Sequence, residues 1–158
     1  MEKRTMTITM TTLIFSATIY GIPKAQPRAR AFAFKGKARM YDPGTAEAWK
    51  GDVAAQTKEL HGRNLQGCIH VQMYFFMARP KSHYRSNGVD LKPSSPRLYY
   101  AKKPDADNLA KAVLDALTAL NVWGDDDQVV ILGVTKTWSG DQRSGCILTI
   151  NTIDENDS

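Results

Sequence analysis

The clearest strand signals come from the spacing of apolar residues along the chain. Between Leu13 and Tyr20 apolar side chains occupy every second position, a period of two that is typical of a β-strand. Cys68 to Ala78 is rich in β-branched and aromatic residues, which favours a central strand. Two further strands are predicted at Gln128 to Val134 and at Gly145 to Ile153.

Helical spacing marks two other segments. Apolar residues recur at intervals of three and four, which predicts one buried helical stripe: Leu109, Ala112, Val113, Ala116, Leu117 and Leu120. A second helix is expected from Ala46 to about Leu60, because a turn with a capping residue precedes it. Pro80 to Pro104 is polar and contains four prolines, so we expect a long loop, of the kind that is usually functional or mobile.

The resulting order is strand, helix, strand, long loop, helix, strand, strand. It predicts an α+β fold in which a mixed β-sheet is packed by two main helices. A length of 158 residues fits a single domain spanning 1–158, with residues 1–10 and 154–158 expected to fray. The chain is 42% hydrophobic and 23% charged, which excludes a largely disordered or fibrous protein.

The cysteines and the apolar start of the chain bear on its compartment. Cys68 and Cys146 have no companion at metal-ligand spacing, so we expect neither a zinc site nor a disulfide, and a reduced, cytoplasmic protein. Threonine and serine interrupt the apolar part of residues 11–20, so this segment is interpreted as a strand rather than a secretion signal. No apolar run approaches the length of a membrane span, so no membrane association is expected.

The formal net charge of +5 conceals a segregation of charges along the chain. Two basic segments, Ile22 to Tyr41 and Arg79 to Lys103, hold thirteen of the 21 basic residues and one acid, Asp90. Basic, proline-containing loops suit a polyanion such as DNA, although a solvated basic surface without a partner is an equally good interpretation of charge alone. The candidate DNA-binding residues are Lys24, Arg28, Arg30, Arg79, Lys81, Arg85, Lys102 and Lys103.

Six aspartates lie between Asp105 and Asp127. Pro104 disfavours a helical conformation at Lys103, so the helix must begin near Asp105 or Asp107, whose side chains can then project to the same side. Within the helix Asp107, Lys111 and Asp115 follow at i+4 spacing, opposite the apolar stripe. A second acidic group, Asp125, Asp126 and Asp127, precedes the next strand.

Carboxylates from both acidic groups would supply the hard oxygen ligands that Mg²⁺ or Mn²⁺ prefers. A divalent ion there would polarise a phosphodiester and generate hydroxide, and a neighbouring lysine would stabilise the developing charge. Taken singly, each residue has a structural alternative: Asp105 or Asp107 as a helix cap, Lys111 with Asp115 as a surface ion pair, and the second group as a turn. Together, in a basic chain, they favour a metal site.

At these residues the sequence resembles the RusA family of Holliday junction resolvases, many of which are carried by phages and prophages. The resemblance runs from KPDADNLAKAVLDAL (Lys103 to Leu117) through VWGDDDQVV (Val122 to Val130) to Lys136, and more weakly to GIPKAQPRAR and RPKSHY. It implies a homodimeric, Mg²⁺-dependent endonuclease that makes paired, symmetric nicks in four-way DNA junctions, in recombination and repair. Mn²⁺ is the alternative ion, and no small-molecule cofactor is implied.

The resemblance also assigns roles to individual residues. It carries the essential acids onto Asp105, Asp107 and Asp126, with Asp125 as a supporting or alternative metal ligand, and the catalytic lysine onto Lys111. A junction with approximate two-fold symmetry is best cut by a two-fold protein, which supports a dimer independently. Two other functions remain open: a non-catalytic DNA-binding protein, and a metal-dependent nuclease that acts on RNA or flaps. A bacterium or phage-infected host is the expected setting.

Overall fold

A computed structural model describes residues 7–27, 30–34, 37–41 and 46–157. Its main sheet has four strands in the order β1-β6-β4-β5. The strands are β1 (Thr7–Tyr20), β4 (Cys68–Met77), β5 (Val129–Trp138) and β6 (Gly145–Asp157). Strand β4 runs parallel to β5, and β6 is antiparallel to both β1 and β4. The mixed sheet and its two helices confirm the predicted α+β class.

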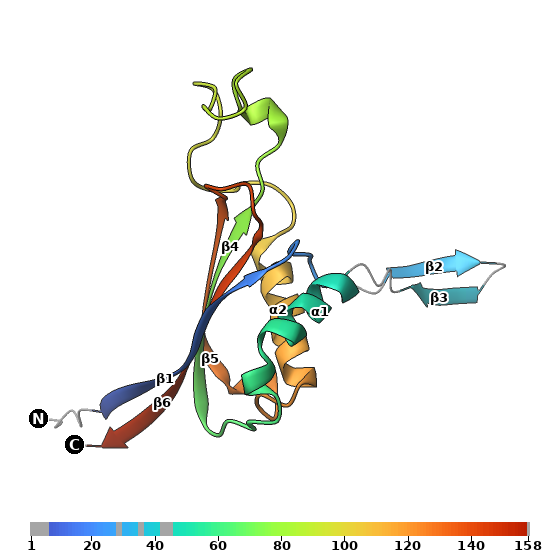
Figure 1. The fold of residues 1–158 in the computed structure, drawn as a ribbon. Coiled ribbons are helices and arrows are strands. Elements are labelled where there is room, and N and C mark those ends of the chain that lie inside the picture. Colours follow the sequence, from blue (N-terminus) through green and yellow to red (C-terminus); the bar gives the residue numbers. More distant parts are fainter. Residues whose placement is uncertain (1–6, 28–29, 35–36, 42–45, 158) are drawn as a thin grey trace, which may run out of the picture.

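The two helices, α1 (Glu47–Gln56) and α2 (Ala106–Ala119), cover one face of the sheet (Figure 1). Alternate residues of β4 point into this layer and are fully buried: Ile69, Val71, Met73 and Phe75. The apolar stripe of α2 meets them, as its spacing predicts, and burying each large side chain contributes about 1.5–3 kcal/mol. This packing fixes which side of α2 remains exposed, and that side carries the acids.

Within the described residues, the two ends of the chain pair with each other, while residues 1–6 and 158 of the segments expected to fray lie outside the described part. Thr7 lies opposite Asp157, and the register continues to Tyr20 opposite Gly145, with one irregularity between Leu13 and Phe15. Each strand thereby satisfies the backbone hydrogen bonds of the other where β4 no longer reaches. In Figure 1 the two ends form a ribbon that extends past the sheet.

The first basic segment contains a hairpin that sequence reasoning missed. Strands β2 (Arg30–Phe34) and β3 (Lys37–Tyr41) form a separate two-stranded antiparallel sheet, which lies apart from the main sheet in Figure 1. Its cations led us to expect a loop, but Phe32 and Phe34 have the alternate spacing of a strand. The helix after it is shorter than expected and ends at Gln56, followed by a 3-10 turn, η1 (Lys58–Leu60).

The sheet face opposite the helices has no helical cover and carries partly exposed apolar side chains. Tyr74 and Ile147 are direct cross-strand neighbours there, 37% and 41% exposed. Leu13 and Ile131 lie farther along this face, in register with Asn151 and His70 respectively.

A search of the described residues for a helix that could span a membrane, by length and by hydropathy, finds none.

Candidate active site

The start of α2 places Asp105 and Asp107 at its amino end. Asp105 is the N-cap residue, with extended backbone angles (φ −68°, ψ 147°), and its carbonyl oxygen accepts the first helical hydrogen bond from Leu109. Its carboxylate makes no capping hydrogen bond, although aspartate commonly does so at this position. Both carboxylate oxygens instead accept from Lys103 Nζ, at 2.9 and 3.0 Å. This acid is therefore directed away from the helix end.

Further along α2, the exposed side presents the predicted row of charges. Asp107 lies in the first turn, where the helix dipole favours an acid. Lys111 Nζ lies 3.4 Å from Asp115 Oδ1, so the predicted i,i+4 ion pair forms at the surface. Such pairs contribute little stability, roughly 0.3–0.5 kcal/mol, which leaves Lys111 available to other anions.

The second acidic group forms a short 3-10 turn, η3 (Asp126–Gln128), ahead of β5. Asp125 caps it by accepting from the backbone of Asp127, and Gln128 completes the capping box through the backbone of Gly124 and Asp125. The amide of Gln128 also donates to the carbonyls of Leu65 and Gly67, which anchors the turn to the segment before β4. Sequence reasoning treated Gln128 only as the first residue of the next strand and missed this structural role.

Asp126 is the acid of this turn that faces α2. A hydrogen bond shared with Asp125, burial and the charge of Asp125 raise the pKa of Asp126, and Asp115 adds to this while Lys111 opposes it. The shared hydrogen bond, together with the Asp127 backbone, lowers the pKa of Asp125. The helix charges that act on Asp126 include Lys111 and Asp115, in agreement with the contact between η3 and α2.

These carboxylates are oxygen donors of the kind that hard divalent cations prefer, so the donor set fits Mg²⁺ or Mn²⁺. Within the described part of the chain, however, no three acidic, histidine or cysteine side chains are close enough to hold a metal ion. Asp105 and Asp107 belong to the start of α2, whereas Asp126 faces its middle. The structure therefore brings the predicted residues onto one side of α2 without closing them around a common point.

Two residues that sequence reasoning did not place in the site organise the chain immediately before Asp105. Lys136 Nζ, on β5, donates to the carbonyls of Lys102 and Pro104 at 2.7 and 2.8 Å. The hydroxyl of Tyr100 donates to the intervening carbonyl of Lys103 at 2.7 Å, and Lys136 Nζ lies 5.4 Å from the Tyr100 ring centroid. Hydrogen bonds therefore hold the carbonyls of three consecutive residues, 102–104. The sequence signal that could have revealed this role is the lysine within the mostly apolar strand β5.

A groove of about 740 Å³ adjoins the start of α2. Four of the eight predicted DNA-binding residues line it: Lys24, Arg79, Lys102 and Lys103. Tyr100 and Trp138 also line it, and the Gln26 backbone N–H donates to the carbonyl of Asn108, which holds the Lys24 segment against α2. Cations distant in sequence therefore converge beside Asp105.

The other predicted DNA-binding residues divide into three cases. Lys81 and Arg85 lie on the loop beyond the groove. Arg30 begins β2, and Arg28 falls outside the described residues.

Among the groove residues, Arg79 already makes internal contacts, because its guanidinium donates to the carbonyls of Pro96 and Arg97 and lies 5.7 Å from the centroid of the Trp138 ring.

The ring of His83 packs edge-on against Trp138, which lines the groove, and its pKa is shifted. Burial, then the charges of Arg79, Lys102 and Lys92, lower the pKa of His83 below 6.5. The folded chain therefore favours neutral His83, while the unfolded chain takes up the proton, so this group's contribution to stability is complete above pH 6.5 and falls as the pH drops below it.

We expect His83→Phe, which keeps a ring at the edge of Trp138, to reduce the loss of melting temperature between about pH 7.5 and 5.5. His61→Gln, at an exposed histidine, is the matched control and should leave that loss unchanged. Equal losses in His83→Phe and the unmodified chain would contradict the assignment.

Comparison with known proteins places the chain in a family. A family model described as "Endodeoxyribonuclease RusA" matches residues 21–150, which include both acidic groups, the groove segments and Lys136. The chain belongs to the RusA family. It is also similar to the uncharacterized protein YqaN of Bacillus subtilis (strain 168), with 35% identity over 127 residues, which cover 80% of this chain and 89% of that protein.

Membership of the RusA family makes the chain an endodeoxyribonuclease, a hydrolase that acts on DNA. The family consists of Holliday junction resolving nucleases that bind branched DNA and generally depend on a divalent metal. The resemblance stated from the two acidic motifs is thereby confirmed.

Proposed function

We propose that the chain resolves four-way DNA junctions by paired, symmetric nicks that depend on Mg²⁺, in DNA recombination and repair. The observation that carries this proposal is the start of α2, where two aspartates stand beside a groove lined with lysine and arginine. A phosphodiester drawn into a basic groove that ends at carboxylates needs a cation between the two negative groups. Mg²⁺ satisfies that need, and Mn²⁺ is the alternative ion.

Asp105, Asp107 and Asp126 are the proposed metal ligands, with Asp125 as a supporting ligand. Metal binding would require Asp105 to exchange its ion pair with Lys103, and this exchange is inexpensive because both side chains are largely exposed, 49% and 85%. When bound, the ion would supply a hydroxide nucleophile and neutralise charge on the scissile phosphate. Lys103, once released, would be free to bind a DNA phosphate at the same place.

Lys111 is the proposed catalytic lysine. It lies one helical turn beyond Asp107 and is among the charges that act on Asp126. An ammonium group there would stabilise the negative charge that develops on the phosphate in the transition state. Its ion pair with Asp115, at 3.4 Å, would limit the lysine's freedom without consuming its charge.

The proposed enzyme is a homodimer, because paired nicks require one active site for each of the two DNA strands that are cut. The uncovered face of the sheet supports this part of the proposal. Its exposed apolar side chains, Tyr74 and Ile147 among them, offer a surface on which a second copy would leave the helix layer and α2 open to DNA. Residues of the β2–β3 hairpin would add cations on each side of the junction.

Nick mapping on a synthetic four-way junction tests the function. With Mg²⁺ we expect two nicks at symmetric positions on opposing strands, and no nicks in EDTA. A panel of flap, linear duplex and RNA substrates of equal length is the control. Faster cleavage of flaps or RNA would replace the proposed substrate, and no nick with Mg²⁺ or Mn²⁺ would favour a DNA-binding role without catalysis.

A further inference from the structure

The long loop between β4 and α2 is held by internal hydrogen bonds and contains a separate pocket. After the 3-10 turn η2 (Lys81–His83), the chain folds back so that Tyr84 pairs with Leu91. The backbone N–H of Lys92 and the hydroxyl of Ser95 both donate to the carbonyl of His83, at 2.9 and 2.7 Å. The loop is thereby closed on itself, and it extends from one end of the sheet (Figure 1).

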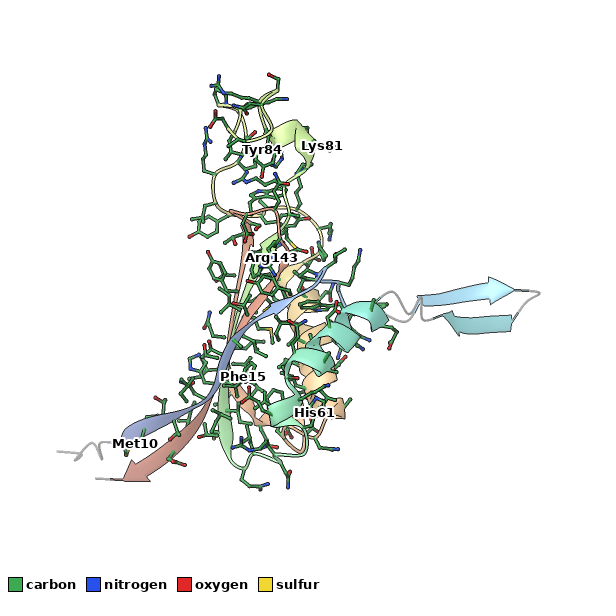
Figure 2. The ribbon with its side chains drawn as sticks, viewed as in Figure 1. Met10, Phe15, His61, Lys81, Tyr84 and Arg143 are labelled. Carbon is green, nitrogen blue, oxygen red and sulfur yellow. The ribbon has the colours of Figure 1, made fainter. Side chains whose placement is uncertain are left out.

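The pocket in this loop is basic and includes one aromatic ring. Its volume is about 670 Å³, and Lys81, Tyr84, Arg85 and Lys92 line it together with Arg79 and Gln142. Figure 2 shows Lys81 and Tyr84 on this loop, away from α1 and α2. A volume of this size lies within the range of roughly 300–1,000 Å³ that is usual for small-molecule and nucleotide-sized ligands.

The cations of the pocket are not explained by internal contacts. Among the described residues, the side chains of Lys81, Arg85 and Lys92 form no hydrogen bond or ion pair. The one acid of the loop, Asp90, is held by the Asn87 amide at 2.7 Å and does not line the pocket. Cations that gather without acids to neutralise them indicate an anionic ligand.

The loop pocket adjoins the groove at the start of α2. Arg79 and Gln142 line both, so the two hollows share a wall. At its other end the groove is lined by Lys103 and Pro104, next to Asp105. A strand that passes the carboxylates and follows the groove over Tyr100 and Trp138 therefore arrives at Tyr84.

We propose that the loop pocket binds an unpaired nucleotide of the DNA strand that runs through the groove, with its phosphates on Arg85 and Lys92 and its base against the ring of Tyr84. This inference rests on the proposed function, because it takes the groove to be the path of the DNA. Base pairs at the branch point of a four-way junction lose stacking on one side, so their nucleotides unpair more readily than those within a continuous duplex. The pocket then favours branched DNA over continuous duplex, in which bases stay stacked and cannot reach Tyr84.

Fluorescence anisotropy of labelled hexathymidylate, measured in EDTA, tests the pocket directly. Stacking of a base on an aromatic ring is worth roughly 1–3 kcal/mol, so Tyr84→Leu should weaken binding about tenfold, while Tyr84→Phe keeps the ring and the affinity. An abasic hexamer of the same length lacks the stacking group, so Tyr84→Leu should leave its affinity unchanged.

The double variant Arg85→Gln/Lys92→Gln should weaken binding of both oligomers. It should also reduce the slope of log affinity against log salt by about 1.4, because single strands release about 0.7 counterion per neutralised phosphate. Lys58→Gln/Arg63→Gln, at two exposed cations far from the pocket along the chain, removes the same charge as a matched control and should change neither quantity.

Two results would contradict nucleotide binding in the loop pocket. One is that Tyr84→Leu binds hexathymidylate as tightly as the unmodified chain, and the other is that Tyr84→Phe loses as much affinity as Tyr84→Leu. Neither depends on catalysis, because metal is absent and the probe is a single strand. Failure of the unmodified chain to nick a four-way junction would remove the proposed function and leave these binding results standing. Normal nicking with no Tyr84 effect would remove the pocket alone.

Discussion

Asp107→Asn should abolish Mg²⁺-dependent nicking of a four-way junction, by about a thousandfold or more, while junction binding in EDTA stays intact. The amide has the shape of the carboxylate and is tolerated at a helix start, so the fold should persist. It lacks the negative charge that a hard divalent cation requires. Nicking rates in Mg²⁺ and gel-shift titrations in EDTA measure the two effects separately.

Asp154→Asn is the matched control for this variant, because Asp154 is an exposed aspartate on the terminal part of β6, in the ribbon with β1. It changes the net charge by the same amount as Asp107→Asn, so a general effect of charge on DNA affinity would appear in both. Undiminished nicking by Asp107→Asn would remove Asp107 from the site and, with it, the proposed metal position at the start of α2.

The elements of the fold that sequence reasoning predicted are those with a local signal, either periodic spacing, composition or a capping residue. The stripe from Leu109 to Leu120 has to face the core, so it fixes both the helix and the exposed side on which Lys111 and Asp115 stand. The period of two between Leu13 and Tyr20 does the same for β1, and the β-branched and aromatic composition of Cys68 to Ala78 identified β4. The strands β1 and β6 are longer than predicted because backbone pairing extends them past the apolar core, where side-chain pattern carries no information.

The parts of the site that were missed depend on contacts distant in sequence. Lys136 reaches Lys102 and Pro104 across 34 and 32 residues, and nothing local in β5 shows where its ammonium points. Tyr100 lies within the predicted long loop, and nothing in that prediction indicated that its hydroxyl holds the Lys103 carbonyl. Sequence spacing therefore identified the acids, whereas only the fold reveals what positions the segment that carries them.

Lys136→Met should slow nicking by about ten- to a hundredfold through loss of this positioning. The substitution removes the two hydrogen bonds to the carbonyls of Lys102 and Pro104, which contribute about 0.5–1.5 kcal/mol each. A total near 2 kcal/mol would lower the melting temperature by about 4–8 °C. The segment before Asp105 would then shift, and a displacement near 1 Å can cost about a hundredfold in rate.

Kinetic and metal-binding measurements distinguish a positioning role of Lys136 from an effect on stability alone. With Lys136→Met we expect kcat to fall with little change in KM, and Mn²⁺ binding, followed by electron paramagnetic resonance, to weaken because Asp105 is displaced. Val53→Ala, at a buried position of α1, should lower the melting temperature by a similar amount and leave both quantities unchanged below its melting transition. Equal losses of kcat in the two variants would mean that Lys136 only stabilises the fold, whereas a loss specific to Lys136→Met, partly restored by Lys136→Arg, would establish that β5 sets the position of the acid at the start of α2.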